Sequence, residues 1–166
     1  MLRSILLLVF LCAASTTFGA SVWDKYLDTY PCAGKNRFFL EPDVVAALKS
    51  VLGKDWGEYE QHRALSGCSA IARYRSYLFV DISQQHVGGY SSMILFNPAS
   101  KKAYVFWLKG RVLDWNAVTY GERPIPEEVL DKFQRELNVG WGHVASFIVR
   151  NGQLAIVKKP SSPIDP

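Results

Sequence analysis

The chain has 166 residues and a formal net charge of +4, which suits one domain of ordinary size and is too short for two full domains. Hydrophobic residues make up 49% of it and charged residues 20%, so the chain can bury a core and is not disordered. Lys and Arg are interleaved with acids and form no run, so nucleic acid is not an expected partner. The aromatic, Gly and Pro content favours sheets and turns over a helical bundle.

The first twenty residues have the pattern of a secretory signal peptide. Arg3 supplies a positive charge, residues 5–14 are apolar but too short to span a bilayer, and small residues follow as far as Ala20. Cleavage after Gly19 or Ala20 removes Arg3 and Cys12 and leaves a net charge of +3. We therefore expect residues 1–20 to be a signal peptide, export to the periplasm, and no membrane insertion once the peptide is removed.

Two cysteines, Cys32 and Cys68, remain after the leader. Two thiols in an oxidising compartment usually pair, so the sequence predicts a Cys32–Cys68 disulfide. The bridge would close a loop of about 37 residues and contribute on the order of 4 kcal/mol in the chain-entropy model. The alternative is a hydrolase in which a Cys68 thiolate acts as nucleophile beside His86, and it requires a free thiol.

The first half of the mature chain predicts an arm, one helix and the start of a sheet. Residues 21–39 form an irregular arm with a short helical turn. Residues 41–52 are a helix, with Pro42 in its first turn, apolar residues on one face and Gly53 as its stop. Residues 56–68 are a second irregular stretch with room for one short strand.

Three consecutive strands follow, at residues 74–82, 90–96 and 101–108, each rich in aromatic and β-branched residues. The turn at 97–100 and the polar, glycine-ended segment 83–89 connect them into an antiparallel meander.

The second half predicts a loop containing Gly110, Asp114 and Gly121, then an amphipathic helix at 126–137 and a hairpin. The hairpin strands are 147–149 and 154–157, around an Asn-Gly turn. Residues 160–166 are a frayed, flexible tail. The expected fold is a single α+β domain over 21–159, with a central antiparallel sheet of about five strands and two helices packed on one face.

No motif indicates a cofactor, a metal site or a catalytic residue. The sequence has no phosphate-binding glycine loop, and His62, His86 and His143 lie far apart and not at metal-ligand spacing. No spacing singles out a pair of carboxylates for glycoside hydrolysis. His62 and His143 are expected in loops or on the surface. We therefore expect no enzyme activity, no cofactor and no metal.

The segment from Ser83 to Gly89 reads Ser-Gln-Gln-His-Val-Gly-Gly and places one imidazole among small and neutral residues between two strands. One interpretation is a plain hairpin tip with an exposed His86. The segment, with the strand, turn and strand that follow it through Leu108, also resembles the Ivy family, the bacterial periplasmic inhibitors of vertebrate lysozyme. That family has a Cys-x-x-His-x-Cys-Gly loop here. His86 and Gly89 match it, while Ser83 and Gly88 stand where the family has cysteines.

The resemblance implies the same fold and a role for His86 in the cleft of a lysozyme, against the catalytic carboxylates. The contacting residues would be Gln85, His86, Val87, Gly88 and Gly89. The implied partner is lysozyme or another peptidoglycan-cleaving enzyme, and the resemblance also allows a homodimer.

Two departures from the family leave alternatives open. Without its own disulfide the loop must order on binding, which costs affinity. A net charge of +3 would repel a basic lysozyme rather than attract it. The alternatives are a periplasmic immunity protein that neutralises a peptidoglycan-degrading toxin, or a binding module of the same fold with another partner.

Overall fold

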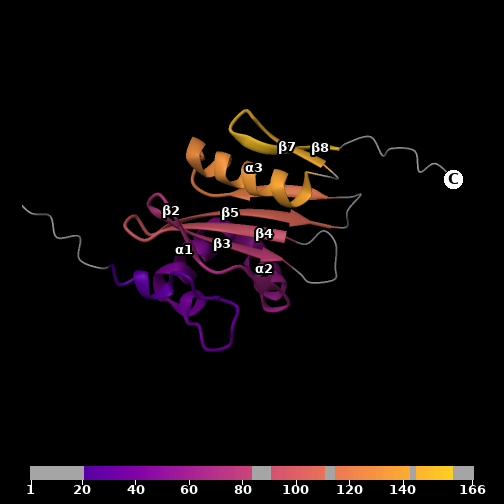
Figure 1. Ribbon diagram of the computed structural model, residues 1–166. Helices are drawn as coiled ribbons and strands as arrows, with labels where there is room; N and C mark the ends of the chain where they lie inside the picture. The colour runs from indigo at the N-terminus through magenta and orange to yellow at the C-terminus, as the bar shows by residue number, and fades with distance from the viewer. Residues whose placement is uncertain (1–20, 84–90, 111–114, 143–144, 159–166) are drawn as a thin grey trace, which may run out of the picture.

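The computed structural model describes residues 21–83, 91–110, 115–142 and 145–158, and its centre is an antiparallel sheet (Figure 1). The three long strands are β3 (Tyr77–Ser83), β4 (Ser91–Asn97) and β5 (Lys102–Lys109). Nearly all of their side chains are buried, on both faces of the sheet. Continuous apolar runs of this kind occur where a sheet is covered on both sides.

Shorter strands extend the sheet to six. The order is β1-β3-β4-β5-β6, and β2 also pairs with β3. All of these pairings are antiparallel. The added strands are β1 (Gly67–Cys68), β2 (Ala72–Tyr74) and β6 (Asn116–Tyr120).

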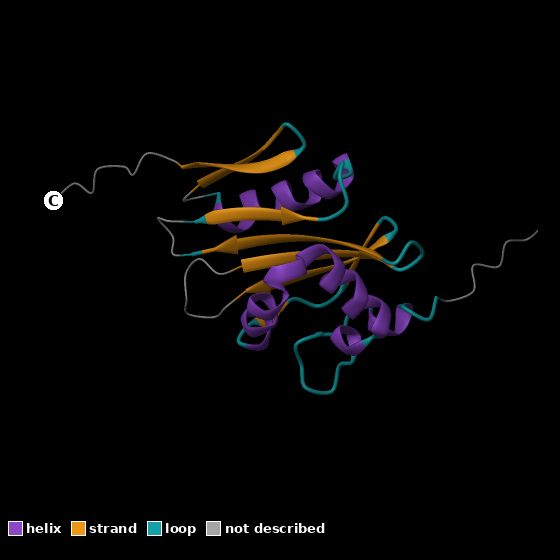
Figure 2. Ribbon diagram, turned by 180° about the vertical axis from the view of Figure 1, so that it is seen from behind, coloured by secondary structure: helices purple, strands orange, loops and turns teal. Residues whose placement is uncertain are grey.

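One face of the sheet is covered by the N-terminal half of the chain (Figure 2). Its helices are α1 (Pro42–Leu52) and α2 (Trp56–Ala64), joined by the 3-10 turn η3 (Gly53–Asp55). Two further 3-10 turns precede them, η1 (Asp24–Tyr26) and η2 (Phe38–Leu40). The core on this side packs helix and arm residues against strand residues, among them Phe38, Leu48, Tyr59, Val80, Ile94 and Trp107.

The other face is covered by the C-terminal part of the chain. Helix α3 (Glu127–Trp141) is followed by a separate hairpin of β7 (Ala145–Arg150) and β8 (Gln153–Lys158). Their apolar side chains pack on the alternate strand positions, in a second core that includes Phe79, Leu95, Phe106, Phe133, Leu137 and Phe147.

The predicted class, a single α+β domain around an antiparallel sheet, is confirmed. The placement of both helices on one face is wrong, because α1 and α3 lie in different cores on opposite faces. The physical reason is the strand composition. A sheet with apolar side chains on both faces must bury both, so the two helices cannot share one side.

Three elements differ from the expected ones by more than their bounds. Residues 56–64, expected to be irregular, form α2, and β6 lies within the expected loop after Gly110. The single strand expected at 74–82 is a hairpin of β2 and β3, turned at Arg75 with a positive φ of 53°. The expected signal peptide at 1–20 and tail at 160–166 lie outside the described residues.

Cys32 and Cys68 form a disulfide that joins the N-terminal arm to β1. Backbone hydrogen bonds reinforce the junction: Asp28 donates to the carbonyl of Ile71 at 2.9 Å, and Ile71 donates to that of Thr29 at 2.9 Å. The pairing engages Cys68, so the nucleophilic thiolate that the hydrolase alternative requires is not available.

We expect the double variant Cys32→Ser, Cys68→Ser to lose about 4 kcal/mol of unfolding free energy, because the unfolded chain regains the entropy of an open loop. Urea denaturation of both proteins measures the difference. A thiol assay on the unfolded, unreduced mature protein, from which the leader with Cys12 has been removed, should find no free cysteine, and two free thiols per chain would contradict the bridge.

Candidate functional site

The strand ends that flank the two long undescribed connections lie together at one end of the sheet. Ser83 pairs with Ser91, and Ser91 pairs with Leu108. Gly67 and Ala117 complete this row on its two sides. We call it the loop end of the sheet, because segments 84–90 and 111–114 connect the strands there (Figure 1). The predicted contact residues lie outside the described residues: Gln85, His86, Val87, Gly88 and Gly89.

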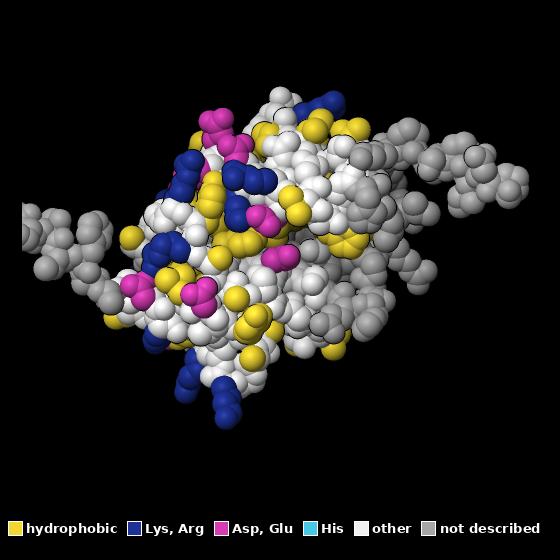
Figure 3. All heavy atoms as spheres, in the orientation of Figure 1, with side chains coloured by type: hydrophobic (Ala, Val, Ile, Leu, Met, Phe, Trp, Pro, Cys, Tyr) yellow, Lys and Arg dark blue, Asp and Glu magenta, His cyan; other side chains and the backbone are white. Residues whose placement is uncertain are grey.

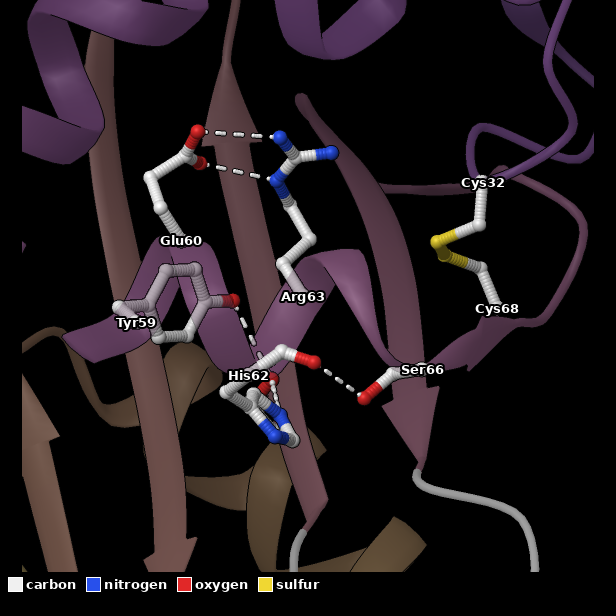
Figure 4. Close-up of polar contacts among 8 residues, drawn as sticks. Cys32, Tyr59, Glu60, His62, Arg63, Ser66 and Cys68 are labelled. Atoms are coloured by element: carbon white, nitrogen blue, oxygen red, sulfur yellow. Dashed lines mark hydrogen bonds and ion pairs between the residues drawn. A yellow bond between two sulfur atoms is a disulfide. The ribbon is translucent and has the colours of Figure 1, made fainter. Parts of the chain in front are cut away.

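Ser92 on β4 lies one residue inward from the loop end. Two polar side chains of α2, Tyr59 and His62, contact it there (Figure 4). The hydroxyls of Tyr59 and Ser92 lie 3.2 Å apart and share a hydrogen bond. His62 Nε2 lies 3.1 Å from the same Ser92 Oγ. The Trp107 ring meets Tyr59 edge-on at 5.1 Å between centroids and stacks on His62 at 5.6 Å. We call these four residues the Ser92 cluster.

A cation and a carboxylate border the Ser92 cluster. Lys109 Nζ lies 3.9 Å from the centroid of the Trp107 ring and 2.9 Å from a carboxylate oxygen of Glu58. The Lys109 side chain is only 19% exposed, so its charge interacts more strongly with the ring and the carboxylate than it would at a fully solvated surface. These contacts join α2 to the end of β5.

Burial sets the electrostatics of the cluster. His62 is 5% exposed, and this burial lowers its pKa to about 4, against a smaller opposing effect of Glu58. Burial also raises the pKa of Tyr59. Both side chains are therefore neutral at pH 7. Ser92 is fully buried, so its hydrogen bond with His62 is structural, and its hydroxyl is not accessible as a nucleophile.

A half-buried carboxyl lies at the same end on the opposite face. Asp81, on β3, has an inaccessible Oδ1 that accepts no hydrogen bond from the described part of the chain. Burial raises its pKa to about 6, and the negative charge of Glu136 on α3 adds to the effect. The Ile82 backbone N–H and the Lys132 ammonium oppose it. Lys132 is itself held by Glu136 at 2.6 Å.

The expected location of His62 in a loop or on the surface is wrong, because it lies on α2 facing the sheet. Tyr59 and His62 are three residues apart and share a helix face, a spacing that could have predicted burial had 56–64 been recognised as a helix. Trp107 is buried in the core, and Trp115 packs edge-on against Trp141 at 5.1 Å. His143 and the rest of 143–144 lie outside the described residues.

Within the described ranges, no group of three or more His, Cys, Asp or Glu side chains is arranged to hold a metal ion. No helix in the same ranges combines the length and the apolar character needed to cross a bilayer.

Binding residues of proteins often lie on loops that a rigid scaffold positions, and a sheet buried on both faces is such a scaffold. Residues 43–139 match the family model described as Inhibitor of vertebrate lysozyme (Ivy). This match spans more than half of the chain, and the chain belongs to the Ivy family, a family of lysozyme inhibitors. Comparisons with curated proteins and with solved structures found no match.

The pKa values of His62 and Asp81 predict opposite pH dependences of stability. The folded-state pKa of His62 is below its unfolded value of 6.5, so the unfolded chain binds its proton first as the pH falls. Stability is therefore lost between pH 6.5 and 4, by about 2 kcal/mol from pH 7 to pH 5. The pKa of Asp81 is raised in the folded state, so the folded chain binds this proton first as the pH falls. Protonation of Asp81 therefore increases the free energy of unfolding by about 1 kcal/mol from pH 7 to pH 5.

Two variants separate these contributions in urea denaturation at pH 7 and pH 5. His62→Gln should lose less stability on acidification than the wild type does, and Asp81→Asn should lose more. Equal pH dependence in the wild type and His62→Gln would contradict the assignment of a neutral buried imidazole.

Proposed function

We propose that this protein inhibits a lysozyme by placing the His86 segment in the active-site cleft of the enzyme, and that it does so in the periplasm. Family membership supports the inhibitor class and the lysozyme partner. The match at 43–139 includes the His86 segment, with the His and Gly spacing of the family loop. The apolar leader at 1–20 supports export.

The observation that carries the proposal is the way the ends of segment 84–90 are held. Ser83 and Ser91 are paired neighbours on the central strands, so the segment leaves and re-enters the sheet at one point. β1 flanks β3 at this point, and its Cys68 is in the disulfide. On the β4 side, Ser92 is fixed by Tyr59 and His62.

The disulfide at Cys68 and the hydrogen bonds to Ser92 offset part of what is lost with the missing loop cysteines. A loop bridged by its own disulfide loses less entropy when it binds, and Ser83 and Gly88 cannot form that bridge. Strand ends that are fixed before binding lose little entropy when a partner binds. The Cys32–Cys68 disulfide and the Ser92 cluster therefore take over part of the role that the loop disulfide has in the family.

The chemistry of the proposed contact is hydrogen bonding between an imidazole and acidic groups. Lysozyme acts through two carboxyl groups that flank the scissile bond. An imidazole placed between them donates a hydrogen bond, and protonation adds a charge-assisted contact. The same placement excludes the sugar substrate, so inhibition follows from occupancy alone.

The test is a cell-wall lysis assay with C-type lysozyme, titrated with the protein and with His86→Ala. Loss of a central contact of this kind costs about 2 kcal/mol or more, so inhibition should weaken by roughly thirtyfold. Gln153→Ala is the matched control, because this exposed residue begins β8 at the hairpin turn, at the opposite end from the loop end (Figure 1). It should inhibit as the wild type does.

Equal inhibition by the wild type and His86→Ala would contradict the role of the segment. Absence of inhibition by folded wild-type protein would redirect the search to another peptidoglycan-cleaving enzyme, such as a toxin neutralised in the periplasm. Cell fractionation with N-terminal mass determination checks export, and a chain that keeps residues 1–20 in the cytoplasm would contradict it.

A further inference from the structure

The N-terminal arm and the end of α2 form a surface that lies almost entirely outside the family match. We define this arm surface by three exposed cations and three exposed apolar side chains. The cations are Lys25, Lys35 and Arg37, and the apolar side chains are Tyr30, Leu40 and Leu65. Only Leu65 falls within the matched range 43–139. In Figure 1 the N-terminal arm lies below the sheet, on the side of α1 and α2.

Its apolar part is unusual for the described part of the chain. Tyr30 is 59% exposed, Leu40 63% and Leu65 76%. Every other exposed large apolar side chain in the described residues is a valine. Two shallow depressions share Asn36 in their linings. One is lined by Leu40, by Pro31, which follows Tyr30, and by Ala64 and Ser66, which flank Leu65; the other is lined by Lys25, Lys35 and Arg37.

Its charge is positive, and Glu41 offsets part of it, because this carboxylate pairs with Lys25 and also interacts electrostatically with Arg37. Within the described residues Lys35 and Arg37 form no ion pair, while Lys25 pairs with Glu41 at 3.1 Å and is itself 61% exposed. Lys and Arg side chains project at the lower edge of the molecule in Figure 3, where Figure 1 places the arm.

The arm surface is held in place before any partner arrives. The disulfide fixes Cys32, and Asn36 donates from Nδ2 to Thr29 Oγ1 at 2.7 Å. Asn36 Oδ1 accepts from the Phe38 N–H at 2.9 Å, which links the arm to η2 in the core. A pre-organised surface loses little entropy on binding.

We propose that the arm surface docks on an anionic lipid bilayer. Cations beside exposed leucine and tyrosine side chains match the bilayer interface, where headgroups attract the charges and the acyl boundary accepts the apolar groups. A dissolved polyanion would use the charges and leave the leucines in water. The docking uses residues other than those of the His86 segment.

The experiment is cosedimentation of the purified exported protein with vesicles, after mass spectrometry shows that residues 1–20 are absent. One vesicle set is phosphatidylcholine alone, and the other contains equal parts of phosphatidylcholine and phosphatidylglycerol. We expect binding to the anionic vesicles at about 0.05 M salt, much weaker binding at about 0.5 M salt, and little binding to the neutral vesicles.

Paired variants locate the surface. Lys35→Gln with Arg37→Gln should lower the partition coefficient roughly thirtyfold. Leu40→Ser with Leu65→Ser should lower it about tenfold. The matched charge control is Arg135→Gln with Arg150→Gln. These two exposed arginines lie on α3 and β7 and form no ion pair in the described residues. The partition coefficient of this control should fall much less than that of the arm variants.

Three results would overturn the proposal: no vesicle binding, equal losses in the arm and control variants, or full binding by the leucine variant with competition by inorganic polyphosphate. The last result would indicate a soluble polyanion. Lysozyme inhibition, measured on the same samples, reports only on the His86 proposal, so failure of either proposal is recognised separately.

Discussion

The burial of both faces of β3, β4 and β5 is the constraint on which the rest of this structure depends. Alternate side chains of these strands enter two different cores, so each strand needs a cover on each side. The N-terminal half of the chain supplies one cover and the C-terminal part the other. With both faces occupied, the edges and ends of the sheet remain for contact with other molecules, and the connections of the long strands lie at one end.

The Ser92 cluster shows how a buried polar group stabilises the end of a sheet. A serine inside an apolar core costs free energy unless it is hydrogen bonded, and Tyr59 and His62 together satisfy Ser92. The ring of Trp107 packs against both of these side chains, Tyr59 and His62. The cluster therefore combines a polar network, which favours one arrangement of α2 over others, with close packing.

Strong local patterns made most of the fold predictable. The helix at 41–52, the three meander strands, the helix beginning near 126 and the Asn-Gly hairpin all carry clear periodicity or turn chemistry, and the structure contains each of them. Helix α2 was missed because polar residues dominate it and its buried face is limited to Tyr59 and His62. Strand β6 was missed because Gly110 and Gly121 bracket a short segment that reads as a loop. The two-sided cover follows from the continuous apolar strands, a pattern that is visible in the sequence.

The candidate site was predictable to a different extent. The spacing around His86 indicated the Ivy family, which the family match then showed, because a short motif between two strands carries specific information. His62 and Ser92 have no such motif, and their contact joins residues thirty positions apart. Only the packing of α2 on β4 brings them together. Long-range contacts of this kind are set by the whole fold and leave little trace in local sequence.

The disulfide between Cys32 and Cys68 also makes the arm sensitive to where the chain folds. In a reducing compartment the two thiols stay apart chemically, and the arm is attached to the sheet only by hydrogen bonds and its aromatic contacts. Oxidation adds a covalent tether and completes the surface that carries Tyr30, Lys35 and Leu40. A reduced and an oxidised chain would differ in this one bond, and only the oxidised chain has its arm covalently tethered to β1.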